Sequence, residues 1–522
     1  MNNNWKPFVL TLLVIGILLA LFHIPRFSIL GHEMRRVNIL SEIGRLTADG
    51  RLQAEVYADS IDGFVEEKLD SNEVKVQHVA YVDSVPEGMT AIEDFGLTDD
   101  EASACMMDAF YAALSQTGER PVRIAYFGDS YIEGDILTAH LRDRLQQIFG
   151  GCGVGFVDIH SETAGFRTTV AAKASGWISH NVNDERSRHF SNALQGINGR
   201  YYIPSGVATM ELRCTPGRMG VRLSKAEQAT VYYTSGAGMQ LMAAVNGGEW
   251  QPLSLTDGTP TITEEIHTVK TLHVDTVYTT ETADSNDNNP AYTLDTTYQE
   301  REVVVRMGEQ AQGSIEHKTV KGDIVRFKIS ISSGESSRFY GVALDGERGI
   351  ALDNFSMRGS NGWHLSTISE ETLKAFARQR PYDLIILHYG LNVANDKQVN
   401  YSGYTQRMKQ SIEHLRAAFP KASILVISVA DRDEKAEDGQ MHTMRGVQEL
   451  VQYQRKMAAD THVAFWNLFQ AMGGNGSVAA MVEKKQANLD YTHINFAGGR
   501  HLASLLFDVL MNGKENYDKR MQ

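Results

Sequence analysis

Three side chains that lie far apart in the sequence are of the types found in nucleophilic active sites. Ser130 ends the segment 122–130, and Asp490 precedes His493 by three residues. A serine hydroxyl becomes an effective nucleophile only when a base takes its proton, and a histidine base needs a carboxylate to fix its tautomer. The three residues can therefore transfer an acyl group, provided that the fold brings them together.

The sequence around Ser130 predicts an exposed position for its hydroxyl. Residues 122–127 are mostly apolar and predict a buried strand, and this pattern breaks at residues 128–130, Gly-Asp-Ser. A helical pattern follows, so Ser130 is expected on a turn at the carboxyl edge of a sheet, where open α/β folds bind ligands. The alternative is a plain turn in which Ser130 only starts the next helix. The helical positions are Leu137, Leu141, Leu145 and Ile148.

Two further segments have the composition of active-site loops. Residues 383–390 predict a buried strand that runs into Gly390 and Asn392. Residues 358–362, Arg-Gly-Ser-Asn-Gly, form a glycine-containing loop that can offer backbone N–H groups. Asp490 and His493 also have a structural alternative, in which they only lead into the closing helix.

These four segments, in this order, resemble the sequence blocks of the SGNH (GDSL) hydrolase superfamily. The Gly-Asp-Ser block corresponds to residues 128–130, the loop glycine to Gly362, the Gly-x-Asn block to residues 390–392, and the Asp-x-x-His block to residues 490–493. The resemblance covers the ends and the core of the catalytic domain. It implies a serine ester hydrolase.

The resemblance also implies a role for each residue. Ser130 would be the nucleophile, His493 the general base, and Asp490 the group that orients the histidine. The oxyanion hole would consist of the Ser130 N–H, the Gly362 N–H and the Asn392 side-chain amide.

The match to the superfamily leaves two points open. Gly359 lies in the same loop as Gly362 and is an alternative donor. The family's usual Asn-Asp pair is Asn392-Val393 in this chain, so the function of that aspartate is absent.

The middle of the chain has a different pattern from its ends. Short runs rich in β-branched and aromatic residues alternate with turn signals, which predicts an all-β sandwich or jelly roll. Its aromatic residues either stack on sugar rings or pack within the strands. The runs are 207–214, 229–233, 239–246, 267–274, 302–307 and 323–330, and the aromatics are Tyr201, Tyr202, Tyr232, Tyr233 and Trp250.

A β-module between the nucleophile and the loop glycine resembles the arrangement in peptidoglycan O-acetylesterases of the SGNH type. That resemblance implies an O-acetylated glycan as substrate and an esterase that removes acetyl or other short acyl groups. An O-acetyltransferase on a surface glycan and a non-catalytic glycan-binding protein on the same fold are the alternatives.

After residue 362 strands and helices alternate again, which predicts a parallel sheet covered by helices. The expected fold class is therefore α/β: a three-layer, parallel-sheet SGNH hydrolase domain, an inserted all-β, jelly-roll-like sandwich and an N-terminal transmembrane helix. The expected divisions are an anchor or signal segment at 1–30, a polar stalk at 31–93, a first hydrolase segment at 94–165, the β-module at 166–340 and a second hydrolase segment at 341–522.

Residues 7–24 are almost entirely apolar, which is long enough to cross a bilayer's hydrocarbon core. A bulky sequence follows, without a small-residue cleavage site, so a retained anchor is favoured over a cleaved signal peptide. The resemblance implies that the catalytic domain lies in the periplasm or outside the cell.

Composition excludes several other classes of protein. The net charge of −14 lacks the basic surface that a nucleic-acid partner requires. Cys105, Cys152 and Cys214 fit no zinc ligand set, and a Cys152–Cys214 disulfide is conceivable only in an oxidising compartment. No metal or organic cofactor is implied, and the oligomeric state is left open.

Overall fold

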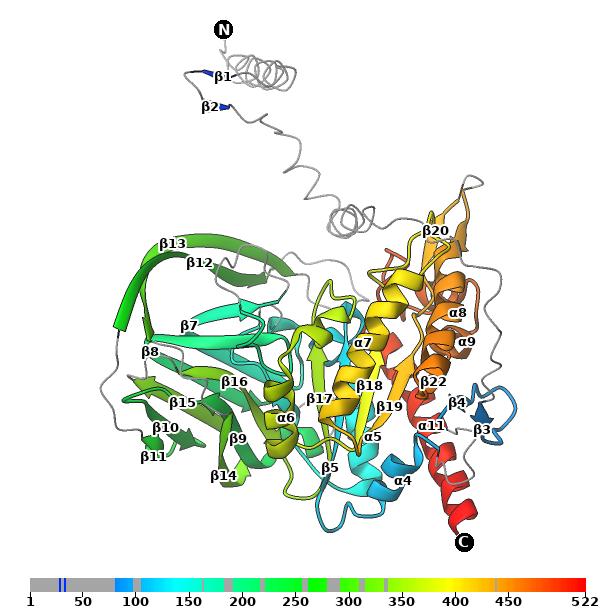
Figure 1. Ribbon diagram of the computed structural model, residues 1–522, viewed down its shortest axis with the longest axis horizontal. Helices are drawn as coiled ribbons and strands as arrows, with labels where there is room; N and C mark the ends of the chain where they lie inside the picture. Colours follow the sequence, from blue (N-terminus) through cyan, green and yellow to red (C-terminus); the bar gives the residue numbers. More distant parts are fainter. Residues whose placement is uncertain are drawn as a thin grey trace. The chain divides into compact units, whose positions relative to one another are not determined.

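The computed structural model divides the chain into two compact units, Met1–Val74 and Lys75–Gln522. In the first unit it describes only the antiparallel pair β1 (Ser28–Ile29) and β2 (His32–Glu33). The second unit holds all the other described strands and the described helices (Figure 1). The described residues are 28–29, 32–33, 80–96, 105–161, 164–182, 191–215, 221–255, 262–278, 292–308, 315–332, 337–436 and 439–522.

A seven-stranded sheet forms the centre of the second unit. Its order is β17-β5-β18-β19-β22-β4-β3, and the first five strands run parallel. β4 and β3 add to one edge in antiparallel pairs. The strands are β3 (Tyr81–Val82), β4 (Ile92–Asp94), β5 (Pro121–Gly128), β17 (Gly349–Ser356), β18 (Leu384–His388), β19 (Ser423–Ile427) and β22 (Ala464–Trp466).

Alternate residues of these strands enter two separate cores. In β5, Ile124 and Tyr126 pack with the helices of one face, whereas Ala125 and Phe127 pack with those of the other. Helices therefore cover both faces of the sheet (Figure 1). The first face carries α4 (Asp108–Leu114), α5 (Thr138–Phe149) and α11 (Phe496–Met521), and the second carries α6 (Glu370–Gln379), α7 (Ser402–Ala418) and α8 (Arg445–Asp460).

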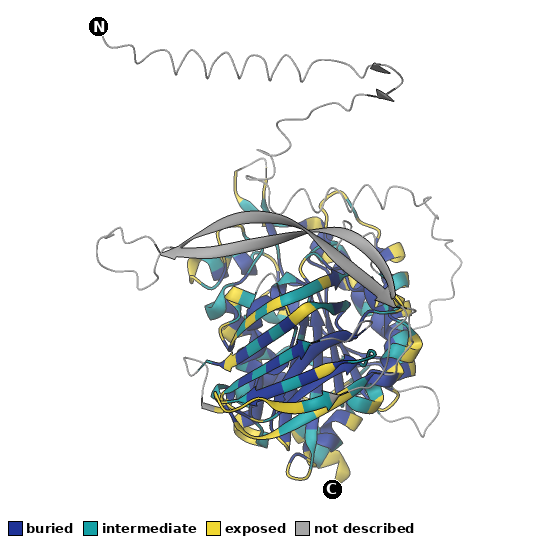
Figure 2. Cartoon of the chain, turned by 90° about the vertical axis from the view of Figure 1, so that its left-hand side faces the viewer, coloured by how far each residue is buried: buried dark blue, intermediate teal, exposed yellow. Residues whose placement is uncertain are grey.

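Between β5 and β17 in the sequence, nine strands form a separate antiparallel sheet, which has its own hydrophobic core (Figure 2). The order is β11-β10-β15-β8-β16-β9-β14, with β6 beside β16 and β7 beside β8. The strands are β6 (Gly155–Val157), β7 (Val170–Asn181), β8 (Arg200–Cys214), β9 (Ala226–Thr234), β10 (Gln240–Val245), β11 (Gln251–Leu255), β14 (Glu316–Ile324), β15 (Arg326–Ser332) and β16 (Arg338–Asp345).

Smaller elements complete the described chain. β12 and β13 pair antiparallel over their whole length, and β20 pairs with β21. Their bounds, with those of the short helices, are β12 (Ile262–Tyr278), β13 (Tyr292–Gly308), β20 (Asp433–Lys435), β21 (Met441–Thr443), α9 (Leu468–Met472), α10 (Ser477–Glu483), η1 (Ser130–Asp135), η2 (Ala164–Phe166), η3 (Val221–Ser224) and η4 (Trp363–Thr367).

The predicted fold class is wrong in its description of the sheets. Most strand pairs are antiparallel, and the seven-stranded sheet is mixed because β4 pairs antiparallel with β22 and β3 pairs antiparallel with β4. In the middle module nine strands form one connected sheet that curls toward a barrel, with β12 and β13 paired separately, and not a sandwich of two packed sheets. Strands of two and three residues, such as β3 and β4, show no periodicity from which their presence or direction can be read.

The predicted membrane helix at residues 7–24 lies outside the described residues. None of the helices that the structure does describe combines the length and the apolar character of a membrane span. The three cysteines are free, so the conceivable Cys152–Cys214 disulfide is not formed. Of the aromatics considered for sugar stacking, Tyr201, Tyr202, Tyr232 and Tyr233 are buried, and only Trp250 is exposed.

Candidate active site

Ser130 lies where β5 ends, the strand second from one edge of the seven-stranded sheet. Asp129 caps the short helix η1 by accepting the Tyr131 N–H at 2.9 Å, and Ser130 is the first residue of that helix. At Gly128 an added Cβ would lie 2.9 Å from the Ile132 side chain and 3.0 Å from the His388 carbonyl oxygen, so any larger residue would crowd the turn. The turn therefore holds Ser130 at the carboxyl edge of the sheet, as the sequence predicts.

The histidine and the aspartate reach Ser130 from the loop before α11. His493 Nε2 lies 3.2 Å from Ser130 Oγ, and His493 Nδ1 lies 2.8 Å from Asp490 Oδ2. Because a carboxylate only accepts, Nδ1 carries the proton and Nε2 is left to accept from the serine hydroxyl. The other oxygen of Asp490 accepts the N–H groups of Thr492 and His493, each at 3.0 Å, which fixes the carboxylate.

The charge state of Asp490 suits this arrangement. Partial burial opposes ionisation, but the hydrogen bonds from the His493 ring and from two backbone N–H groups outweigh it and lower the carboxyl's pKa. Asp490 is therefore an anion at neutral pH. The side chains of His493 and Asp490 are 39% and 47% exposed, so substrate and water can reach the pair.

The Asn392 side chain is close to the serine but already has partners. Its Nδ2 donates to Asp129 Oδ2 at 3.1 Å and to the Ser360 carbonyl at 2.9 Å. Gly390 positions the turn, since it has φ of 134° and a Cβ there would lie 2.8 Å from Val429. Asn392 can stabilise an oxyanion only if one of its two hydrogen bonds is exchanged for the substrate.

The two loop glycines differ in their backbone donors. Gly362 N–H donates to Ser360 Oγ at 3.1 Å. Among the described residues, neither the Gly359 N–H nor the Ser130 N–H has a hydrogen-bond partner. Both glycines have positive φ, 73° at Gly359 and 92° at Gly362. The geometry thus leaves Gly359 as the freer donor, and the choice between the two glycines stays a prediction.

The loop that carries these glycines is tied to η1 by an ion pair. Arg358 Nη2 lies 2.6 Å from Glu133 Oε2, and the Glu133 carboxylate is nearly buried. The Met357 N–H also donates to the Gly128 carbonyl at 2.9 Å. These contacts hold the possible oxyanion donors beside the serine turn.

Asp129 is a functional candidate that the sequence alone did not single out. Its side chain is 1% exposed, and burial raises its pKa to about 7, against the opposing effects of the Tyr131 N–H and of His493. It joins the serine turn to Asn392, because it accepts from both. The sequence feature that could have identified Asp129 is its position inside the Gly-Asp-Ser block, next to the proposed nucleophile.

A buried network of charged and polar side chains surrounds Asp135, the last residue of η1. The sequence alone did not single out this network, which holds the helix that begins at Ser130. Asp135 has φ of 63°, and it accepts hydrogen bonds from Arg142, Arg167 and Asn354 at 2.9–3.3 Å. Burial works against the charge, but the two guanidiniums hold the pKa of this carboxyl well below its usual range. The network connects η1 to β17 and to the start of the β-module.

The β-module borders the site. Arg200 Nη1 donates to the Ser356 carbonyl at 3.2 Å, and Gln195 Nε2 donates to Thr367 Oγ1 at 3.0 Å. A Cβ on Gly199 would lie 2.7 Å from the Met357 side chain. Residues 195–200 therefore pack on the same loop that carries Gly359 and Gly362.

Comparison with known proteins finds a shared fold but no close relative. No protein-family model and no curated protein matches the sequence. A solved structure described as "Peptidoglycan O-acetylesterase in action, 5 min" matches with a TM-score of 0.57 and 18% identity, over 81% of this chain and 99% of that chain. At this identity the likeness shows that the two chains have the same fold.

Two further structures are more distant. A family two carbohydrate esterase from Clostridium thermocellum matches at 12% identity and TM-score 0.25, over 62% of this chain and 98% of its own. One from Cellvibrio japonicus matches at 8% identity and TM-score 0.23, over 67% and 98%. These scores are too low to bear on the fold. All three of these structural neighbours are esterases of glycans or peptidoglycan.

Proposed function

We propose that this protein is a serine esterase that removes O-acetyl or other short acyl groups from a glycan of the cell envelope or the extracellular space. The observation that carries the proposal is the hydrogen-bonded chain from Ser130 through His493 to Asp490. A nucleophile, a base and an orienting carboxylate in contact are what covalent acyl transfer requires. The shared fold with a peptidoglycan O-acetylesterase supports the choice of a glycan ester.

In the proposed reaction, Ser130 Oγ attacks the ester carbonyl while its proton passes to His493 Nε2. Backbone N–H groups and the Asn392 amide stabilise the resulting oxyanion. The C–O bond to the sugar breaks as His493 returns the proton to the departing sugar hydroxyl, which leaves an acyl group on Ser130. Water, activated by the same histidine, then releases the acid and restores the serine.

Water rather than a second sugar is the proposed acceptor of the acyl group. The exposure of His493 and Asp490 gives water direct access to the base that deacylates the enzyme. The test is to supply an acetylated glycan together with an excess of unacetylated oligosaccharide, and to measure both products. Release of free acetate supports the esterase, whereas transfer of most acetyl groups to the oligosaccharide would make the protein a transferase.

Asn392→Ala is expected to lower kcat by about 10²–10³-fold, the usual cost of losing one oxyanion-hole donor. KM should change little, because the amide acts mainly on charge that develops in the transition state. Steady-state hydrolysis of p-nitrophenyl acetate by the purified full chain measures both constants. The control is Asn400→Ala, at an exposed residue before α7 whose Oδ1 likewise makes two hydrogen bonds, from the Ser402 N–H and the Tyr453 hydroxyl. A change in KM alone would place Asn392 in substrate binding instead.

The rate of hydrolysis is expected to rise between pH 5 and pH 8. Only a neutral imidazole can accept the serine proton, so the reaction needs the neutral ring as its base. Asp490, with its lowered pKa, stays ionised throughout, whereas Asp129, with a pKa of about 7, gains negative charge in the same interval. Initial rates at constant ionic strength test this expectation. A flat or falling profile would rule out His493 as the general base.

A further inference from the structure

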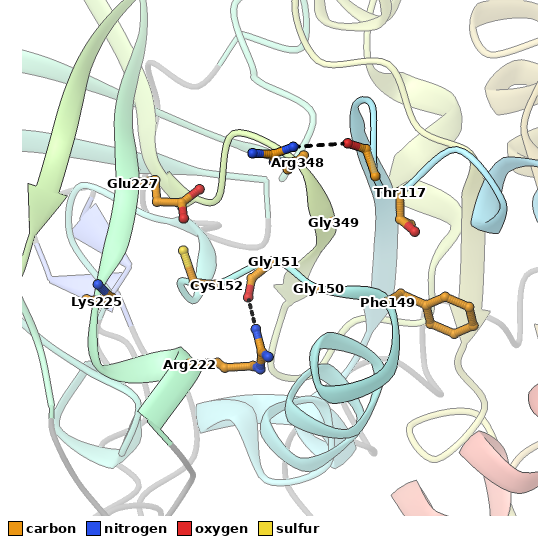
Figure 3. A pocket seen from close by; sticks show the side chains of 11 residues that line it. Thr117, Phe149, Gly150, Gly151, Cys152, Arg222, Lys225, Glu227, Arg348 and Gly349 are labelled. Carbon is orange, nitrogen blue, oxygen red and sulfur yellow. Dashed lines mark hydrogen bonds between the residues drawn. The ribbon is translucent and has the colours of Figure 1, made fainter.

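A pocket of about 530 Å³, whose lining residues Figure 3 shows, lies at the amino ends of β5 and β17. Thr117 and Gly118 precede β5 on its wall, and Gly349 is the first residue of β17. Ser130 follows the other end of β5, and eight residues at ~3.3 Å each place the two sites about 25 Å apart. The pocket is thus separate from the candidate active site.

The lining of this pocket is positively charged in a chain whose net charge is −14. Three cationic side chains line it, Arg222 and Lys225 from the β-module and Arg348 from the turn between β16 and β17, against one carboxylate, Glu227 (Figure 3). Lys225 pairs with Asp323 at 3.0 Å, outside the lining.

The two arginines are the cations of this lining that can take a new anionic partner. Within the described residues of the chain, neither Arg222 nor Arg348 forms a salt bridge. Arg222 Nη1 donates to the Gly151 carbonyl at 3.2 Å, and Arg348 Nη1 donates to the Gly118 carbonyl at 3.4 Å. Each contact places an exposed guanidinium at the pocket wall and uses only one of its five N–H groups.

Glu227 is the one carboxylate among the described lining residues, against three cations, and its Oε2 already accepts the Glu347 N–H at 2.9 Å. Burial raises the pKa of the Cys152 thiol to about 12, so the thiol is neutral at physiological pH. The backbone of residues 150–151 packs closely against Ile350. A Cβ on Gly151 would lie 2.6 Å from the Ile350 backbone, and the Ile350 N–H donates to the Gly150 carbonyl at 2.9 Å. The close packing of this backbone fixes the position of the Gly151 carbonyl, to which the exposed Arg222 side chain donates.

We propose that this pocket binds the carboxylate or phosphate group of a sugar-sized anionic ligand, held by Arg222 and Arg348. A guanidinium presents a planar set of donors that matches either group, and two of them at one cavity give both charge and orientation. A uronic acid and a sugar phosphate are the two sources of this chemistry. The inference stands independently of the esterase reaction, because the pocket shares no residue with that site.

Calorimetric titration of the purified full chain tests the proposal. The probes are glucuronic acid, glucose 1-phosphate and, as the uncharged comparison, glucose. At least one anion should bind and glucose should not, and Arg222→Gln/Arg348→Gln should weaken binding by tenfold or more, the effect of losing roughly 1.4 kcal/mol. The matched control is Lys318→Gln/Lys421→Gln, which removes two exposed positive charges outside the pocket.

The pattern of binding decides between the outcomes. Binding of only one anion identifies whether the carboxylate or the phosphate is preferred. The proposal is overturned if neither anion binds, if glucose binds equally well, or if the arginine and lysine double variants have the same affinity as the unaltered chain. Thermal unfolding of each variant shows whether it is folded, so a loss of binding with an unchanged transition is attributable to the pocket.

Discussion

Ser130→Ala should lower the rate of ester hydrolysis by at least about 10⁴-fold, the scale seen when a serine nucleophile is removed from a hydrogen-bonded triad. The reason is geometric: Ser130 Oγ is the hydroxyl 3.2 Å from His493 Nε2, and without it the base has no nucleophile to deprotonate. Any remaining rate comes from water in the same site. Hydrolysis of p-nitrophenyl acetate and of an acetylated glycan by the full chain measures this effect.

The chain provides a matched control for this variant. Ser504 Oγ lies 3.3 Å from His140 Nε2, so it too is a half-buried serine in contact with a histidine. Among the described residues, His140 has no carboxylate partner, and burial lowers its pKa. Ser504→Ala should leave activity unchanged. Equal activity losses in both variants would mean that the effect is structural, and near-normal activity of Ser130→Ala would refute the assignment of the nucleophile.

Arg380→Met should lower the free energy of unfolding by about 3–5 kcal/mol, the cost of breaking a buried ion pair by removing one partner. Arg380 is 1% exposed and lies between Asp345 of β16 and Asp353 of β17, at 2.7 and 2.6 Å. Its removal leaves two buried carboxylates without their counter-charge. Asp345 belongs to the β-module and Asp353 to the seven-stranded sheet. The substitution should therefore lower the stability of the β-module and of the sheet together.

Urea unfolding, followed by circular dichroism, measures the change. Lys374→Met is the control, because Lys374 pairs with Glu370 on an exposed face of α6, where an ion pair contributes ~1 kcal/mol or less. If Arg380→Met is too unstable to purify, Asp345→Asn, which keeps Arg380 beside Asp353, provides a milder test. A loss below about 1 kcal/mol in Arg380→Met would show that the buried ion pairs do not stabilise the junction.

The residues proposed for catalysis were predictable because each one stands in a short, local pattern. Ser130 follows a buried strand, and Asp490 and His493 are three residues apart, so one loop can place both. The structure brings these three into contact and places Asn392 and both loop glycines nearby. Their catalytic roles remain predictions until activity is measured.

Features that depend on distant partners were not predictable. Asp135 and Asn354 are 219 positions apart, and only the folded chain shows that they share a buried charge network. The pocket at Arg222 and Arg348 likewise forms where the β-module meets the catalytic sheet. The sheet directions were wrongly predicted because β3 and β4 are too short to show a pattern, and because pairing within the module is set by contacts far apart in the sequence.

The most direct test of the proposed mechanism is to look for the acyl group on the protein. The full chain is mixed with an O-acetylated glycan, stopped with acid during the first turnovers, and digested for mass spectrometry. The mechanism predicts one acetyl group on the peptide that contains Ser130, and none in the Ser130→Ala variant. Release of acetate without acetylation of that peptide, or acetylation at another residue, would contradict it.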